Sequence, residues 1–385
     1  MKPKVALVHD WLTGMRGGER CLEVFCEIFP NADLFTLLRR PGAVSPTIER
    51  MSIHTSWLQY IPGVASYYRY LLPLLPLAIQ QFRLAQYDLV LSSSHAVAKG
   101  VPCRDHALHV CYCFTPMRYI WDQSHIYFPR PRFSRISWAF LQAVFRRLRA
   151  WDVKTAHGVD EFIAISHHVA AKIRAYYNRS AVVIPPPVNC AFFKPDAAQR
   201  RHDAAFYLLV SALVPYKRVA LAVEAFNRLR LPLVVIGTGP ERQRLERIAA
   251  THIRFLGWQP DEVVRDYYRR CWALIFPGEE DFGIVPLEAQ ACGRPVIAFG
   301  KGGALETIIS LNHATVESSP DAAPTGVFFY EPTVEALCDA ISVFQRHATA
   351  FSPAAMRGNA LRFNRPVFRD KIKDFVAGKM GITIG

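Results

Sequence analysis

Short apolar runs alternate with longer helical patterns along this chain, and the alternation starts again after a proline-rich segment near the middle. Apolar runs of this length, separated by helical stretches, are typical of buried strands in parallel sheets. Such a chain folds as α/β layers, with helices covering both faces of each sheet. The expected strands are 4–10, 87–94, 108–114 and 161–166 in the first set, and 205–212, 231–237, 253–258, 272–278 and 294–300 in the second.

The segment VVIPPPVNCAFFKPD, residues 182–196, separates the two sets of strands. Its consecutive prolines fix φ and remove backbone donors, so this segment cannot continue a helix. The chain has 385 residues, which is enough for two domains of ordinary size. We therefore expect a Rossmann-like domain at 1–185 and a second one at 186–362, with a ligand-binding cleft between them at the carboxyl ends of the strands.

The chain is basic, with 46 Lys and Arg residues against 32 Asp and Glu residues and a formal net charge of +14. Such a charge favours nucleotide phosphates, nucleic acid or an acidic membrane surface as partners. A nucleic-acid-binding protein would interleave basic and aromatic residues on a known module, and no such module is visible. We therefore expect an anionic partner other than nucleic acid.

Cysteine usage and the distribution of apolar runs favour a cytoplasmic location. The nine cysteines form no C-x-x-C pair, which is typical of reduced thiols. The first apolar run is too short for the core of a signal peptide, and the run YLLPLLPLAI is interrupted by Pro73 and Pro76. We expect neither a secretion signal nor a membrane-spanning helix.

The stretch GEEDFGIVPLEAQACGRPVIAFGKGG, residues 278–303, contains the main candidate site. Pro286 is suited to the first turn of a helix, where a missing N–H costs nothing, and Gly293 is suited to end that helix. Because an apolar run precedes the stretch, the predicted order is strand, loop, helix. The N–H groups of the first helical turn, with the backbone of residues 283–285, would form an anion site suited to a phosphate.

Glu280 and Glu288 flank this predicted phosphate site, with Glu288 expected in the first helical turn. A carboxylate repels a phosphate, but it accepts two hydrogen bonds from neighbouring hydroxyls such as those of a ribose or a hexose. A ligand with a sugar, a diphosphate and a ribose meets these requirements, which predicts a nucleotide sugar. The alternative is that Glu288 complements the helix dipole and Glu280 is a solvated loop charge.

The segment EEDFGIVPLEAQACGRPVIAFGKGGALETI resembles the E-x7-E signature of the retaining glycosyltransferases of family 4, with Glu280 and Glu288 as its two glutamates. The segments HDWLTGMRGGERCLE, YDLVLSSSHAVAKGV, CYCFTPMRYIWD and SALVPYKRVALAVEAF look like a subgroup that builds bacterial surface polysaccharides, several of whose members use GDP-mannose or related GDP-sugars. The resemblance implies a GT-B fold of two facing Rossmann-like domains. It places the donor on the second domain, the acceptor on the first, and a last helix at 363–385 that returns to the first domain.

The resemblance also implies roles for residues of the stretch 278–303. Glu280 would contact the transferred hexose and Glu288 the ribose. The backbone of Phe282, Gly283, Ile284 and Val285 would donate hydrogen bonds to the same ligand. These roles agree with the reading of the residues by themselves.

Lys217 and Arg218 follow the predicted strand at 205–212 and are our candidates to hold the diphosphate. The diphosphate gains negative charge as it leaves, and fixed cations stabilise that charge in the transition state. The alternative is that both are exposed loop charges. Many family members carry an arginine at the position of Ala212, and we expect Arg218 to compensate for its absence.

The first domain offers four further candidate residues. Gly17 and Gly18 follow the first strand, and they are either a close approach to the diphosphate or a plain turn. Relatives often place a histidine at the end of the strand at 108–114, where this chain has Phe114. His95 is our candidate polar group in the cleft, with a structural role as its alternative. Arg118 is a candidate on the acceptor side.

We expect no metal and no cofactor, because the sequence has no D-x-D motif and no His or Cys cluster with metal-ligand spacing.

The resemblance implies transfer of a hexose with retention, by front-face attack in which the donor phosphate helps to deprotonate the acceptor hydroxyl. A GDP-mannose-like donor is favoured, with a UDP-sugar as the alternative. A GT-B protein that binds nucleotide sugar without transfer is the second alternative. A dinucleotide oxidoreductase is disfavoured, because GMRGGERC lacks G-x-G-x-x-G spacing.

The segment 130–152 has the pattern of an amphipathic helix with an aromatic-rich apolar face and a basic face that includes Arg135, Arg146 and Arg149. Such a helix would contact anionic lipid on the inner face of the cytoplasmic membrane, where polyprenyl-diphosphate-linked acceptors reside. An ordinary core-packed helix with solvated arginines fits the pattern equally well.

Overall fold

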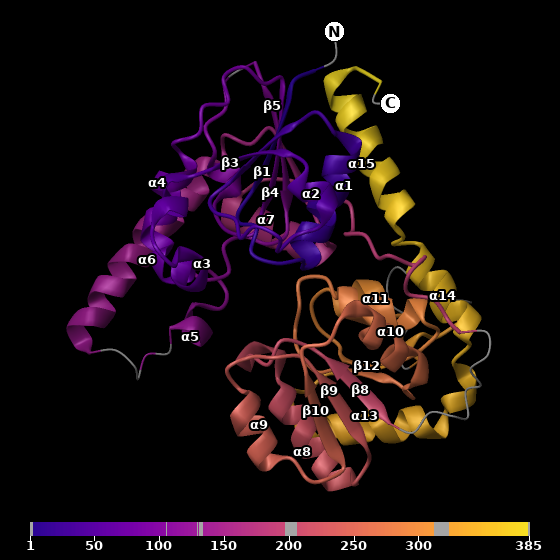
Figure 1. Ribbon diagram of the computed structural model, residues 1–385. Helices are drawn as coiled ribbons and strands as arrows, with labels where there is room; N and C mark the ends of the chain where they lie inside the picture. Colours follow the sequence, from indigo (N-terminus) through magenta and orange to yellow (C-terminus); the bar gives the residue numbers. More distant parts are fainter. Residues whose placement is uncertain are drawn as a thin grey trace. The chain divides into compact units, whose positions relative to one another are not determined.

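The computed structural model describes residues 3–104, 106–128, 130, 134–196, 206–311 and 323–383. The chain divides into two compact units: unit 1 contains residues 1–186 and 368–385, and unit 2 contains residues 187–367. Each unit has one parallel sheet with helices packed on it (Figure 1). The expected α/β fold with two parallel sheets is therefore confirmed.

Unit 1 contains a seven-stranded sheet with the order β3-β2-β1-β4-β5-β6-β7, in which all neighbours pair in parallel. The strands are β1 (Val5–His9), β2 (Asp33–Thr36), β3 (Ser52–Thr55), β4 (Leu89–Ser94), β5 (Leu108–Cys113), β6 (Glu161–Ala164) and β7 (Val182–Val183). β1 and β4 are buried along their whole length; each begins with apolar residues, and they end in His9 and in Ser92 to Ser94, respectively. The strand order reverses between them, and open α/β sheets bind ligands at the carboxyl ends of such strands.

The helices of unit 1 surround this sheet and enclose its apolar core. The α-helices are α1 (Gly17–Ile28), α2 (Pro46–Glu49), α3 (Val64–Tyr67), α4 (Leu75–Ile79), α5 (Ser124–Tyr127), α6 (Arg135–Ala156) and α7 (His167–Tyr177). The 3-10 helices are η1 (Trp57–Tyr60), η2 (Tyr68–Leu74) and η3 (Ala98–Gly100). One core cluster joins the proline-interrupted segment η2–α4 to the inner face of α6, including Phe145 and Leu148.

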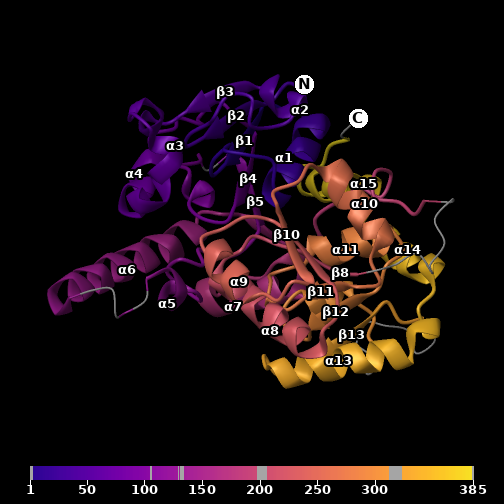
Figure 2. The same ribbon diagram turned by 60° about the horizontal axis from the view of Figure 1, so that its bottom comes forward.

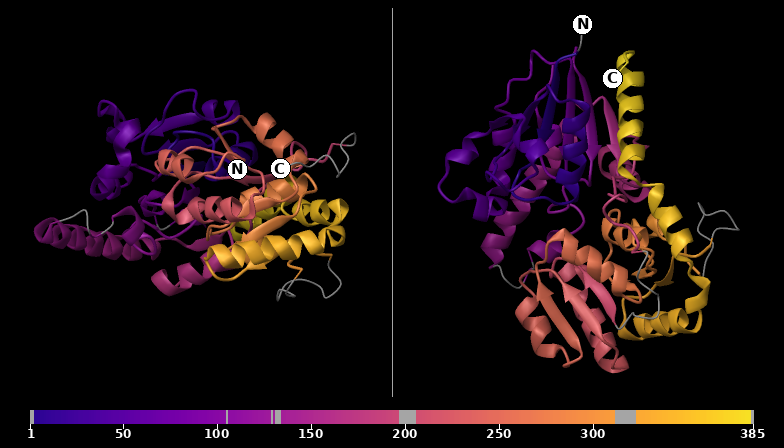
Figure 3. Two further views of the ribbon diagram at one scale, coloured as in Figure 1. Left: turned by 90° about the horizontal axis from the view of Figure 1, so that it is seen from below. Right: turned by 45° about the vertical axis from the view of Figure 1, so that its right-hand side comes forward.

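The last helix, α15 (Arg365–Met380), lies against unit 1 from Phe368 onward (Figure 3). Phe368 is buried, with its ring centroid 5.8 Å from that of Phe25 on α1 and 5.6 Å from that of Tyr112 on β5. Lys379 forms an ion pair with Glu161 near the other end of the helix. Apolar packing at one end and charge pairing at the other therefore fix α15 to the sheet of unit 1.

Unit 2 contains a six-stranded parallel sheet with the order β10-β9-β8-β11-β12-β13 (Figure 2). The strands are β8 (Tyr207–Val210), β9 (Leu233–Ile236), β10 (Ile253–Gly257), β11 (Leu274–Phe276), β12 (Val296–Phe299) and β13 (Gly326–Phe329). Its α-helices are α8 (Val219–Leu229), α9 (Arg242–Ile248), α10 (Asp261–Arg270), α11 (Ile284–Ala291), α12 (Ala304–Thr307), α13 (Val334–Arg346) and α14 (Pro353–Leu361). Two 3-10 helices, η6 (Pro215–Lys217) and η7 (Ala348–Ala350), lie in connections. The strand order reverses between β8 and β11, as it does between β1 and β4 in unit 1.

The predicted helix at 130–152 corresponds to α6, which starts at Arg135 after Ser134 caps it by accepting a hydrogen bond from the N–H of Ser137. Residues 131–133 of the prediction lie outside the described residues. Among the helices of the described residues, none is long and apolar enough to span a bilayer.

Candidate active site

The two glycine-containing loops of the stretch 278–303 pack directly on each other in unit 2. Glu280 pairs with Gly302 in an isolated bridge, and the N–H of Gly303 donates to the carbonyl of Glu280 over 2.8 Å. A Cβ atom at position 303 would lie 2.3 Å from the Cα of Phe282, which explains the glycine there. The second loop therefore supports the backbone of the acidic loop.

Lys217 and Glu280 form an ion pair in unit 2, and their side chains are 15% and 24% exposed. Lys217 ends η6 after β8, whereas Glu280 lies in the loop after β11. The two strands are neighbours in the sheet, so their carboxyl ends bring the two loops together. The sequence-predicted cation and carboxylate thus meet at the reversal point of the sheet.

Arg218 adopts a left-handed backbone conformation with φ 51°, between η6 and α8. Its guanidinium carbon lies 4.6 Å from the centre of the Phe299 ring at the end of β12. Its Nη1 atom is buried and has no hydrogen-bond partner among the described residues. A buried guanidinium donor without a partner is costly, and an anionic ligand at this position would satisfy it.

Helix α11 begins directly after Gly283, whose φ of +102° turns the chain into the helix. Gly283 has no side chain to cap the helix, so the N–H groups at Ile284 and Val285 form an uncapped helix start suited to an anion. The Phe282 side chain is buried, with its ring 5.7 Å from that of Phe363. Residues 282–285 are therefore placed to contribute backbone groups rather than side chains.

Glu288 lies one turn into α11, not in its first turn as expected, because the helix starts at Ile284 rather than closer to Pro286. Its side chain is largely buried and accepts a hydrogen bond of 3.0 Å from the hydroxyl of Tyr268 on α10. Burial, followed by the Glu288 charge, raises the pKa of Tyr268 well above its ordinary value, so Tyr268 remains a donor. Tyr268 thus holds the orientation of the Glu288 carboxylate.

A buried polar network that the sequence reading missed holds α11 in place. The side-chain amide of Gln290 donates to the carbonyl of Thr307 over 2.9 Å, and Asn359 donates to the Gln290 side chain over 2.7 Å and to the same carbonyl over 3.0 Å. All three residues are buried. Their partners are 17 to 69 residues apart in sequence, so no local pattern indicated this network.

In unit 1, Gly17 and Gly18 are the first two residues of α1, whereas the sequence reading placed them ahead of the helix. A Cβ atom at Gly18 would lie 3.4 Å from the ring of Phe114 and 3.5 Å from that of His9. Phe114 follows β5, and its ring centroid is 6.3 Å from that of His95. The structure therefore brings Gly18, Phe114 and His95 to the same end of the sheet.

Asp10 is a site residue that the sequence reading missed. Its buried carboxylate accepts backbone hydrogen bonds of 2.7 to 3.0 Å from His95, Ala96, Val97 and Ala98. It also lies 3.1 Å from Nδ1 of His95. Asp10 therefore fixes both the loop after β4 and the ring of His95, and Nδ1 donates to it, which leaves Nε2 as an acceptor.

His9 and Glu19 are two further buried titratable groups beside the glycine pair. Nδ1 of His9 lies 2.7 Å from the hydroxyl of Ser93, and burial lowers the pKa of His9 to about 4. Burial raises the pKa of Glu19 to about 7, although its carboxylate accepts the backbone N–H of Arg16 over 3.0 Å. The charge at the start of α1 therefore depends on pH near neutrality.

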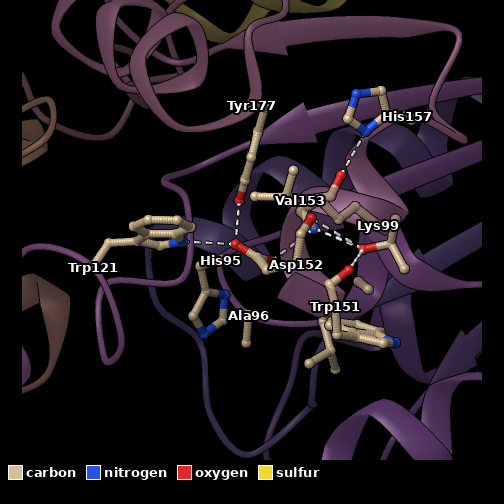
Figure 4. Close-up of polar contacts among 12 residues, drawn as sticks. His95, Ala96, Lys99, Trp121, Trp151, Asp152, Val153, His157 and Tyr177 are labelled. Carbon is tan, nitrogen blue, oxygen red and sulfur yellow. Dashed lines mark hydrogen bonds and ion pairs between the residues drawn. The ribbon is translucent and has the colours of Figure 1, made fainter. Parts of the chain in front are cut away.

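The loop that carries His95 is tied to α6 by the buried ion pair of Lys99 and Asp152 (Figure 4). Nζ of Lys99 lies 2.7 Å from Oδ1 of Asp152 and 2.8 Å from the Asp152 carbonyl oxygen. Trp121 and Tyr177 each donate to Oδ2 of Asp152 over 2.8 Å. Because Lys99 supplies the opposite charge and two donors satisfy Oδ2, the pair supports this end of the sheet.

Arg118 lies in the loop after β5, where its charge acts on both His95 and Tyr119. Among the described residues, no group of three or more His, Cys, Asp or Glu side chains is arranged to hold a metal ion.

The candidate site residues of unit 2 are gathered at the ends of β8, β11 and β12, and those of unit 1 at the ends of β1, β4 and β5.

The two parallel Rossmann-like sheets define a GT-B fold, and solved structures of that class are similar over nearly the whole chain. Sucrose-phosphate synthase from Thermosynechococcus elongatus has a TM-score of 0.72 at 17% identity, covering 99% of this chain and 100% of that chain. Anabaena Alr3699/HepE in complex with UDP and glucose has a TM-score of 0.66 at 17% identity, covering 98% and 100%. Residues 193–345 match the glycosyl transferases group 1 family, so this part of the chain is a group 1 glycosyltransferase domain.

Curated relatives agree with this assignment. The D-inositol 3-phosphate glycosyltransferase of Geodermatophilus obscurus is 30% identical over 256 residues, which are 53% of this chain and 57% of that protein. The GDP-mannose-dependent α-(1-6)-phosphatidylinositol monomannoside mannosyltransferase of Mycolicibacterium smegmatis is 27% identical over 214 residues, or 48% and 55%. The chain thus spans about half the length of these relatives. The expected GT-B fold and the resemblance to family 4 glycosyltransferases are confirmed.

Proposed function

We propose that this protein is a retaining glycosyltransferase that moves a hexose from a nucleotide sugar to a hydroxyl of a glycan or lipid-linked acceptor in surface polysaccharide synthesis. The observation that carries the proposal is the Lys217–Glu280 ion pair beside the uncapped start of α11. The group 1 domain that contains both residues supports it. This arrangement offers a cation and N–H groups to a diphosphate and a carboxylate to a sugar.

Each group then has one role in donor binding. Lys217, Arg218 and the backbone of residues 282–285 hold the diphosphate, and the unsatisfied Nη1 of Arg218 supports this role. Glu280 accepts hydrogen bonds from the hexose. Glu288, oriented by Tyr268, accepts hydrogen bonds from the ribose hydroxyls. Fixed charges of this kind act most strongly on the leaving diphosphate, where negative charge develops.

In the transfer step, a bond forms between the acceptor oxygen and the anomeric carbon on the face from which the diphosphate leaves. The bond from the anomeric carbon to the diphosphate oxygen breaks, and a donor phosphate oxygen takes the proton of the acceptor hydroxyl. We expect no metal requirement, because Lys217 and Arg218 supply the positive charge. Unchanged turnover after exhaustive EDTA treatment tests this expectation.

GDP-mannose is the donor we favour, and the name of the M. smegmatis relative supports it. A UDP-sugar is the alternative, supported by the UDP-containing complexes of Anabaena HepE. Thermal shifts with GDP-mannose, UDP-glucose and dTDP-glucose separate these donors, since a ligand that binds only the folded state raises its stability. Donor hydrolysis or transfer by the wild type, lost in Glu280→Ala, would exclude a protein that only binds nucleotide sugar.

We also propose that unit 1 contacts the inner face of the cytoplasmic membrane through the first half of α6. Ile136 and Phe140 are 85% and 71% exposed there, with exposed Arg146 and Arg147 further along the helix. From Phe145 onward the helix buries Phe145 and Leu148 in the core, so this part packs as an ordinary helix. The first half projects beyond the rest of unit 1 (Figure 1). An exposed apolar and basic surface of this kind suits anionic lipid.

A further inference from the structure

His95 is held in one orientation by Asp10 and Trp11 of unit 1. Oδ2 of Asp10 lies 3.1 Å from Nδ1 of His95. The ring centroid of Trp11 lies 4.5 Å from that of His95, with the two ring planes at 87°. Asp10 and Trp11 are buried, whereas the His95 side chain is 27% exposed. The imidazole is therefore fixed by buried groups and can still be reached from solvent.

The contact with Asp10 determines which ring nitrogen of His95 can bind a ligand. An ionised carboxylate only accepts hydrogen bonds, so Nδ1 carries the proton and Nε2 has a free lone pair. Burial lowers the pKa of His95 most strongly, and Asp10 opposes this shift. The charges of Arg118, Arg16 and Arg69 lower the pKa further. The ring is therefore neutral near pH 7, and Nε2 is a hydrogen-bond acceptor there.

Phe114 is a partly exposed aromatic side chain beside His95. The two ring centroids are 6.3 Å apart, and the Phe114 centroid lies 5.3 Å from that of buried Tyr112. A Cβ atom at Gly18 would lie 3.4 Å from the Phe114 ring, so the start of α1 packs against this ring. Neighbouring groups thus hold both rings in place before any ligand binds, which lowers the entropic cost of binding.

His95 and Phe114 lie at the carboxyl edge of the sheet of unit 1. His95 follows β4 and Phe114 follows β5, and these two strands are neighbours. The strand order reverses between β1 and β4. Open parallel sheets bind ligands at this edge, next to such a reversal. The two side chains are therefore in a position where the fold favours a ligand.

The chemistry of the two side chains fits a sugar. Nε2 of His95 accepts a hydrogen bond from a sugar hydroxyl. The Phe114 ring packs against the apolar C–H face of a pyranose, because the face of an aromatic ring is apolar and weakly negative. Sites for small molecules commonly combine aromatic side chains with a few fixed polar groups in this way.

We propose that His95 and Phe114 form a subsite for a sugar of the acceptor. This inference rests on the proposed function, in which the reacting hydroxyl gives its proton to the donor phosphate. One hydroxyl proton cannot serve two acceptors, so Nε2 of His95 takes a second hydroxyl. The acceptor is therefore a sugar with at least two free hydroxyls rather than a bare prenyl phosphate or a monohydric alcohol.

The test uses the full-length Glu280→Ala variant, in which the proposed hexose contact of unit 2 is removed. The probes are the methyl α-glycosides of mannose, glucose, galactose and N-acetylglucosamine, and saturation-transfer NMR measures their binding. At least one of these sugars should bind. Adding His95→Asn should lower its affinity about ten-fold, because the asparagine amide can still donate to Asp10 but nothing replaces the Nε2 acceptor.

His95→Gln separates a binding role from a structural one. The glutamine carbonyl oxygen can reach the position of Nε2, so His95→Gln should keep much of the sugar affinity that His95→Asn loses. A purely structural contact between His95 and Asp10 predicts the opposite order, with His95→Asn the milder change. His157→Asn, at an exposed histidine of unit 1, is the control and should leave the sugar affinity unchanged.

Phe114→Leu tests the second half of the subsite without changing the contact with Asp10. It keeps an apolar side chain but removes the aromatic face, so it should lower the affinity for the same sugar several-fold. Phe140→Leu, at a phenylalanine of unit 1 that is 71% exposed, is its control. Phe114→Leu also keeps the test valid if His95→Asn fails to fold.

Two results would overturn the proposal: binding of none of the four sugars to the Glu280→Ala variant, or sugar affinity that neither His95→Asn nor Phe114→Leu changes. Binding of GDP-mannose and UDP-glucose to the wild type is measured in parallel. Sugar binding without nucleotide-sugar binding would contradict the proposed function and leave the sugar subsite standing. Nucleotide-sugar binding without sugar binding would refute the subsite alone.

Discussion

The ammonium group of Lys217 pairs with the carboxylate of Glu280, so the cation proposed for the diphosphate and the acid proposed for the hexose neutralise each other. Under the proposed function, a nucleotide sugar would replace both halves of this pair, because its diphosphate would take Lys217 and its hydroxyls would take Glu280. A nucleoside diphosphate without sugar would replace only one half and leave the Glu280 charge beside its phosphates. The pair would then favour the substrate over the product that remains after transfer.

This relationship predicts that Glu280→Gln strengthens the binding of a nucleoside diphosphate but slows transfer. The substitution removes the negative charge but keeps the size of the side chain, so GDP or UDP should bind several-fold more tightly than to wild type. Transfer should fall about a hundred-fold or more, because the hexose loses a charged hydrogen-bond acceptor. Titration calorimetry and a transfer assay measure the two effects.

Glu279→Gln is the matched control for Glu280→Gln. Glu279 is adjacent, but it pairs with Lys301 at 3.3 Å in a more exposed position. It should change neither ligand affinity nor transfer appreciably, since exposed ion pairs contribute little. Weaker binding of GDP and UDP to Glu280→Gln than to wild type would contradict the competition for Lys217.

Tyr268→Phe should weaken donor binding without removing any charge. The substitution deletes the hydroxyl that donates to buried Glu288 and leaves that carboxylate one hydrogen bond short. We expect a loss of about 1–3 kcal/mol, divided between the free energy of unfolding and the free energy of donor binding. Urea unfolding and donor titration measure both parts. Tyr267→Phe is the control, because the neighbouring Tyr267 hydroxyl does not contact Glu288. An equal loss in Tyr267→Phe would refute the role of Tyr268.

Gly303→Ala should disrupt the candidate site in unit 2 because its Cβ atom would lie 2.3 Å from the Cα of Phe282. The acidic loop must move to relieve this backbone clash, so donor binding should drop at least ten-fold. Gly358→Ala on α14 is the control, since no atom lies within 4 Å of its added Cβ and alanine favours helix. Nucleotide-sugar affinity and melting temperature are measured for both variants. Normal donor binding by Gly303→Ala would contradict a fixed acidic loop.

Glu19 should make the stability of the protein depend on pH in a way that Glu19→Gln removes. Burial raises the pKa of Glu19 from 4.5 to about 7, so the folded state holds a proton that the unfolded state releases at lower pH. Stability from this group is therefore present below pH 4.5 and is lost as pH rises toward 7. The loss approaches about 3 kcal/mol, from 1.4 kcal/mol per pKa unit.

The measurement compares urea unfolding of wild type and Glu19→Gln at several pH values between 4.5 and 8. The stability of the variant relative to wild type should increase with pH up to about 7 and then stay constant. His9 has the opposite effect, because its lowered pKa destabilises the folded state in acid, and its Nε2 lies 4.0 Å from Oε1 of Glu19. Glu27→Gln, at an exposed position of the same helix, should give a difference that does not vary with pH.

The proposed membrane contact predicts that Ile136→Ser/Phe140→Ser lowers binding to vesicles of phosphatidylglycerol about ten-fold or more. Both side chains are exposed, so the variant should melt at the wild-type temperature. Wild type should bind vesicles of phosphatidylcholine weakly, and salt should weaken binding to phosphatidylglycerol. Leu305→Ser replaces an exposed apolar residue of unit 2 as control. Co-sedimentation that is unchanged in the α6 variant would exclude this helix as the contact.

The sequence indicated most of the sheet strands, because β1, β5, β8, β9, β11 and β12 are buried and mostly apolar, and β4 begins with a buried apolar run. It missed β2, β3, β7 and β13. The first three have four residues or fewer, and β3 is partly exposed, so their side chains form no continuous apolar run. β13 is buried, but it begins with a glycine after residues 312–322, which lie outside the described residues.

The sequence predicted only part of the candidate site, because some site residues act through contacts with distant parts of the chain. Glu280, Glu288 and the glycines between strand and helix lie within one stretch, so local chemistry was enough to suggest a sugar and a phosphate. Asp10 had no local sign of its role, because the four N–H groups it accepts lie 85 to 88 residues further along the chain. The same holds for Tyr268, which reaches Glu288 from another helix.

By itself, the sequence determined the two parallel sheets and the acidic glycine-containing stretch, since burial and backbone chemistry act there over a few neighbouring residues. Only the tertiary structure decided which distant groups meet: Lys217 with Glu280, Asp10 with the loop of His95, and Tyr268 with Glu288. The order of the strands in each sheet determines which loops are adjacent, and that order is set by long-range packing.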